Sequence, residues 1–70
     1  MEREYAVEVV KQILVQTNRV FGYTIVTTLN GNIAVSIDLK NNFLLQSAII
    51  DIAKKHGLTT EQSNGSIILY

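Results

Sequence analysis

The first stretch of the chain, from Glu2 to Thr17, carries its apolar residues at helical spacing. These residues recur at i, i+3, i+4, i+7 and i+8 and would form one stripe: Ala6, Val9, Val10, Ile13 and Leu14. We therefore predict a helix over 2–17, ended by Asn18 in the left-handed conformation. A strand is the alternative for part of this segment, because Tyr5, Val7 and Val9 also alternate and valine favours sheets.

The segment from Val20 to Ile37 contains no charged side chain and is predicted to be a β-hairpin folded about Asn30-Gly31. A two-residue loop would mix polar and apolar residues on both faces. A three-residue loop, 29–31, places Gly31 where a type I turn with a G1 bulge needs positive φ. It also segregates one largely apolar face: Phe21, Tyr23, Ile25, Thr27, Ile33, Val35, Ile37 and Leu39. Because a one-residue slip flips every side chain, we predict the three-residue loop, with Phe21 and Tyr23 in the core.

A second helix is predicted after Asn41 or Asn42, either of which can accept a hydrogen bond from its first turn. Its apolar stripe consists of Leu45, Ala48, Ile49, Ile52 and Ala53. Gly57 can adopt the left-handed conformation, and Leu58 can fold back on Ala53 as in a Schellman motif. These two residues predict that the second helix ends just before Gly57.

The remainder of the chain predicts a second hairpin, 58–62 and 66–70, around Ser63-Asn64-Gly65. The helix–hairpin order therefore occurs twice, which suggests an internal duplication, although hairpins commonly use Asn-Gly turns. The segment Ser66 to Tyr70 is apolar on both faces and should be a central strand or covered on both sides. We predict one α+β domain over 1–70, a two-layer sandwich in α-β-β-α-β-β order. Its four-stranded antiparallel sheet carries both helices on one face, in a strand order left open.

Composition narrows the classes of protein. The 70 residues are 47% hydrophobic and 17% charged, which argues against disorder. Six basic and six acidic residues balance, so no net field attracts nucleic acid or anionic membranes. The start of the chain does not resemble a signal peptide, and no apolar run approaches the roughly 18 residues that span a bilayer. We expect a cytoplasmic protein that is not embedded in a membrane.

The sequence contains no cysteine, no phosphate-binding glycine loop and no nucleophile–base spacing. We therefore expect no catalytic residues, no metal site and no cofactor, and no enzymatic activity. Glu4 and Glu8 share a helix face and could offer two carboxylates to a divalent ion, but most such pairs are solvated surface residues that repel each other slightly. Lys54, Lys55 and His56 form a cationic cluster at the C-terminal end of the predicted helix, where the helix dipole stabilises positive charge. If a dimer brought two such clusters together, they could bind nucleic acid, and this is the alternative function.

The strongest functional signal is the uncharged surface of the sheet. A chain this short, without disulfide or metal, gains most from a partner chain. We expect a homodimer, or docking of another protein, through the edge or the face of the sheet. The alternative is that threonine and serine simply make this a solvated face. The residues predicted to bind the partner are Thr24, Val26, Thr28, Ala34, Ser36, Ile67 and Leu69.

Overall fold

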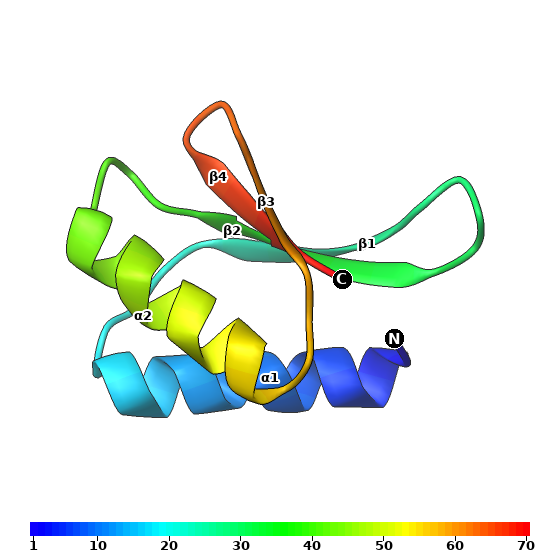
Figure 1. Cartoon of the computed structure of the whole chain (residues 1–70), viewed down its shortest axis with the longest axis horizontal. Helices are drawn as coiled ribbons and strands as arrows, with labels where there is room; N and C mark the ends of the chain where they lie inside the picture. The colour runs from blue at the N-terminus through cyan, green and yellow to red at the C-terminus, as the bar shows by residue number, and fades with distance from the viewer.

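Two helices cover one face of a four-stranded antiparallel sheet in the computed structural model, which describes residues 1–70 (Figure 1). The strands run in the order β1-β2-β4-β3, so β1 and β3 are the edges. The predicted α+β sandwich and its element order are confirmed. The elements are α1 (Arg3–Thr17), β1 (Tyr23–Thr27), β2 (Ile33–Asp38), α2 (Phe43–Lys55), β3 (Thr60–Ser63) and β4 (Ser66–Leu69).

The helix ends follow the capping chemistry of the sequence. Helix α1 is continuous, so the strand alternative for this segment is wrong, and Asn18 ends it with φ of 52°. At the start of α2, the side-chain oxygen of Asn42 accepts a hydrogen bond of 3.0 Å from the Leu45 amide. At its end, the Leu58 amide donates to the Ala53 carbonyl at 2.8 Å, and Gly57 has φ of 69°. The predicted Schellman motif is confirmed, and the cap is Asn42 rather than Asn41.

The first hairpin has the predicted three-residue loop. Strand β1 pairs with β2 so that Tyr23 faces Ile37 and Ile25 faces Val35. The Gly31 amide donates to the Thr28 carbonyl at 2.9 Å, and Gly31 has φ of 81°, as a type I turn with a G1 bulge requires. The segregation of apolar residues onto one face therefore decided the register.

The second hairpin uses the same Asn-Gly dipeptide in a different turn. Ser63 pairs directly with Ser66, which leaves a loop of Asn64 and Gly65 alone. Both loop residues have positive φ, 49° and 82°, as in a type I′ turn. The two hairpins thus share a dipeptide but not a turn.

The core lies between the helices and the inner face of the sheet, the face that carries Val35, Ile37, Ile67 and Leu69. Helix α1 contributes Ala6, Val9, Val10 and Ile13, and α2 contributes Leu45, Ile49, Ile52 and Ala53. Ile67 pairs with Ile37 and Leu69 with Val35, and all four are fully buried. The prediction that Ile67 and Leu69 lie on a partner surface is therefore wrong. Strand β4 is central, as its two apolar faces predicted, and the side chains of these two residues point to the helices.

The inner face is less completely covered toward β1. Phe21 packs against the core, but Tyr23 is 49% exposed although the register places it on the inner face. The two aromatic rings meet edge to face, with centroids 6.3 Å apart. The prediction that Tyr23 lies in the core is wrong, because β1 is an edge strand and has a neighbouring strand on one side only.

Candidate interaction surface of the sheet

Strand β1 leaves half of its backbone polar groups unpaired. The Asp38 amide donates to the Gly22 carbonyl at 2.9 Å, and the Thr28 amide donates to the Asn32 carbonyl at 2.7 Å. Because hydrogen-bonded and non-bonded pairs alternate along an antiparallel ladder, the even-numbered residues of β1 bond to β2. The N–H and C=O groups of the odd-numbered residues therefore point away from the sheet. We call this row, formed by Tyr23, Ile25 and Thr27, the β1 edge.

The β1 edge has none of the devices that usually protect an edge strand. Natural edges are blunted by charged side chains, proline, bulges or very short strands. The sequence of β1 is YTIVT, five residues without charge or proline. The other edge, β3, has four residues with the sequence TEQS, and Glu61 and Gln62 on it are exposed. The two edges of the sheet are thus chemically different, and β1 is the edge without a charged side chain.

Apolar side chains accompany the free backbone groups of the β1 edge. Ile25 is half-buried and packs against the core from the inner face. Tyr23 and Thr27, two residues before and after it, are exposed on the same side. A strand added at this edge would therefore meet both hydrogen-bonding groups and an apolar strip.

The outer face, turned away from the helices, is less uniform than the sequence suggested. Thr24, Ser36, Ile68 and Glu61 form one row across the four strands. The Tyr70 hydroxyl lies 3.4 Å from a carboxylate oxygen of that glutamate. The outer face thus carries one carboxylate on β3 and a second, Asp38, at the end of β2, and it is uncharged over β1.

The predicted partner residues occupy several environments. Thr24, Val26, Thr28 and Ser36 are at least partly accessible on the outer face. Ala34 pairs with Val26 on this face but is fully buried, because its side chain is a single methyl group on a strand that has neighbouring strands on both sides. It is inaccessible to a partner, so its inclusion in the predicted contact surface is wrong.

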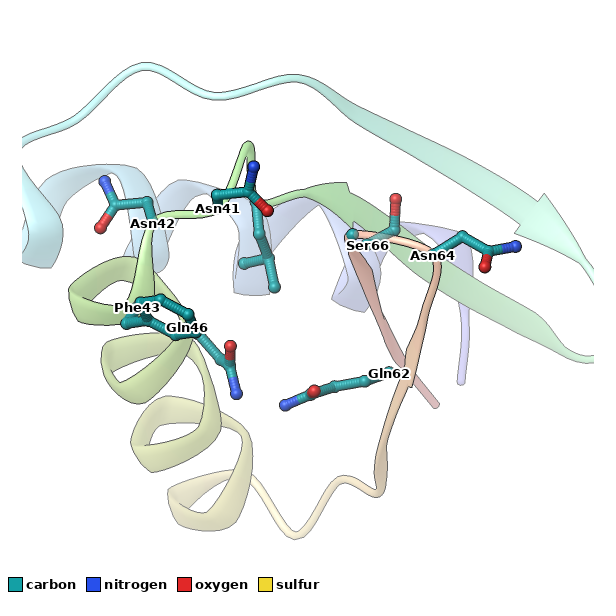
Figure 2. Close-up of a pocket in the computed structure, with 9 residues that line it drawn as sticks. Asn41, Asn42, Phe43, Gln46, Gln62, Asn64 and Ser66 are labelled. Carbon is teal, nitrogen blue, oxygen red and sulfur yellow. The ribbon is translucent and has the colours of Figure 1, made fainter.

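The hollow between the start of α2 and the β3–β4 turn is about 370 Å³ in volume (Figure 2). Gln46 and Gln62 point toward one another across it. Asn42 and Asn64 point away from it, and the Asn42 side chain is already engaged in capping α2. The polar groups therefore do not converge on one ligand position, and no acid–base pair lines the hollow.

His56 joins the end of α2 to α1. Its Nδ1 lies 2.9 Å from the Tyr5 hydroxyl and its Nε2 lies 2.8 Å from the Gln12 side-chain oxygen. A carboxamide oxygen only accepts hydrogen bonds, so Nε2 is the donor in its bond to Gln12. Both ring nitrogens are thus occupied within the chain.

The predicted nucleic-acid group is therefore reduced to Lys54 and Lys55, both exposed in the last turn of α2. Such an arrangement is also the ordinary cationic end of a solvated helix.

Comparison of the chain with known protein families, curated proteins and solved structures found no match. No group of three or more histidine, cysteine, aspartate or glutamate residues is placed to hold a metal ion. None of the helices has the length and apolar character needed to cross a membrane.

Proposed function

We propose that this chain is a small protein-interaction domain that acts without catalysis and binds a second copy of itself through the β1 edge. The observation that carries the proposal is the row of outward N–H and C=O groups at Tyr23, Ile25 and Thr27, flanked by neither charge nor proline. We propose further that it acts in the cytoplasm, the compartment expected from the sequence.

Pairing at this edge supplies two favourable terms, hydrogen bonds and apolar burial, against the translational and rotational freedom that two copies lose on association. Each intramolecular hydrogen bond contributes a net of about 0.5–1.5 kcal/mol after its exchange with water. Burial of the exposed parts of Tyr23 and Ile25 adds to this gain. The net charge of zero means that two copies approach without long-range repulsion. A core of this size supplies only about 3–5 kcal/mol, so the added stability is substantial.

The edge is a better candidate than the outer face. The outer face carries Glu61, and three of the residues predicted to bind there, Ala34, Ile67 and Leu69, are fully buried. Thr24 and Val26 remain accessible on β1, and Thr28 just after it, directly beside the edge. They therefore fit the rim of an edge interface better than the centre of a face-to-face one.

Two threonine-to-proline variants test the proposal. Thr27 and Thr60 both have amides that point out of the sheet, on β1 and β3 respectively. Proline removes the outward donor and is tolerated at edge strands. We expect wild type and Thr60→Pro to form dimers in light scattering between micromolar and millimolar concentration, and Thr27→Pro to be monomeric.

Circular dichroism establishes that both variants retain the fold before their masses are compared. Equal masses for folded Thr27→Pro and wild type would contradict the proposal, and so would a wild-type protein that stays monomeric at millimolar concentration.

A further inference from the structure

The β1 edge is complementary to itself in one particular alignment. Resting on the proposed function, we infer that two copies pair their β1 strands antiparallel about a two-fold axis at Ile25. The two four-stranded sheets then form one continuous sheet. Tyr23 of each copy faces Thr27 of the second copy, and the two Ile25 residues face each other.

The spacing of the free groups selects this register. The outward residues of β1 are Tyr23, Ile25 and Thr27, and Ile25 is the middle one. Each hydrogen-bonded pair in an antiparallel ladder exchanges two bonds, so three pairs give about six. A shift by two residues in either direction leaves two pairs and about four bonds. The alignment on Ile25 is the one that pairs the whole of both strands.

The side chains agree with the same register. On the inner face, the two Ile25 side chains lie together and extend the core across the axis, since each is already half-buried against its own core. The Tyr23 ring lies beside Thr27 of the second copy, an aromatic–β-branched pair that favours sheets. On the outer face, Thr24 lies opposite Val26 of the second copy. No pair in this register brings two charges together.

The assembly closes at two copies. A two-fold axis uses the same surface of both subunits, so the β1 edges are consumed by the pairing. The edges that remain are the two β3 strands, which are shorter and carry Glu61 and Gln62. These charged and amide side chains oppose the addition of further strands, so the sheet does not grow into a filament.

Engineered disulfides test the register, because the chain has no cysteine of its own. Facing residues have Cα atoms about 5.5 Å apart in a hydrogen-bonded pair and about 4.5 Å apart in a non-bonded pair. Both spacings lie within the range that a disulfide accepts. Diagonal neighbours are about 7–8 Å apart, which disfavours a bond.

We expect Ile25→Cys to form a disulfide-linked dimer rapidly when it is oxidised at a concentration where the protein is dimeric. Thr24→Cys and Val26→Cys should each cross-link slowly alone, whereas their mixture, after subunit exchange, should yield the mixed disulfide at least several times faster. This second pair keeps Ile25, so the test survives if Ile25→Cys fails to fold.

The register would be overturned if Thr24→Cys alone or Val26→Cys alone cross-linked faster than their mixture. Each of these residues faces its own copy in one of the two shifted alignments. If Thr27→Pro still abolishes the dimer in that case, the proposed function stands and the register alone is wrong. A wild-type protein that is monomeric at every concentration overturns both.

Discussion

At the scale of single residues, Val26 and Leu69 show how differently two apolar positions of the sheet respond to charge. Leu69 is fully buried in the core, whereas Val26 is half-buried on the outer face of the edge strand. Lysine at position 69 must bury an ammonium group without a partner, which costs more than a domain of this size can supply. Lysine at position 26 can extend its head group into water.

We therefore expect Leu69→Lys to be unfolded and Val26→Lys to remain folded but to dissociate more readily, since position 26 faces Thr24 of the second copy across the proposed interface. Circular dichroism and light scattering on the same samples separate the two effects. A folded Leu69→Lys would contradict the assignment of Leu69 to the core. A folded Val26→Lys that is as dimeric as the wild type would contradict the placement of Val26 opposite Thr24 of the second copy.

The same strand marks the limit of prediction for single side chains. Between Ser66 and Tyr70, Ile67 and Leu69 alternate with Ile68 and Tyr70. Both faces of this segment are therefore apolar, and the pattern does not say which face meets the helices. The answer comes from the pairing of Ile67 with Ile37, a residue distant in the sequence. Tyr23 was misplaced for a related reason, because its exposure depends on which strands lie at the edges.

At the scale of the secondary-structure elements, the two Asn-Gly turns offer a matched comparison. Asn64 has φ of 49°, whereas Asn30 does not have positive φ. Alanine in the left-handed conformation costs roughly 1–2 kcal/mol, and asparagine adopts it more readily. We expect Asn64→Ala to lower the free energy of unfolding by about 1 kcal/mol, and Asn30→Ala to change it by less than about 0.5 kcal/mol. Urea denaturation measures both, and a larger loss in Asn30→Ala would contradict the assignment of turns.

Elements were predicted well where their signals are local. The left-handed Asn18, the Asn42 cap and the Gly57-Leu58 motif each act within a few residues, and all three are observed. The first hairpin register followed from its side chains, because only one alignment segregates the apolar set. The strand order β1-β2-β4-β3 did not follow, since it depends on how the two hairpins meet.

At the scale of the whole molecule, the asymmetry between the two edges of the sheet is the feature that accounts best for a partner. The helices cover the inner face of the sheet (Figure 1). Of the two edge strands, β3 carries the charged Glu61, whereas β1 carries no charged side chain. The sequence predicted an uncharged sheet surface that a partner would cover. It did not predict that the uncharged edge lies on one strand, β1. That strand is an edge only because β2 and β4 pair at the centre of the sheet.

Amide hydrogen exchange resolved by residue tests the central claim most directly. In a dimer paired through β1, the amides of Tyr23, Ile25 and Thr27 are hydrogen-bonded, so we predict that they exchange slowly at millimolar concentration and faster on dilution. The outward amides of Thr60 and Gln62 on β3 serve as the internal control and should exchange fast throughout. Fast exchange at all three β1 positions, in a sample whose mass is that of a dimer, would contradict the account and place the interface elsewhere.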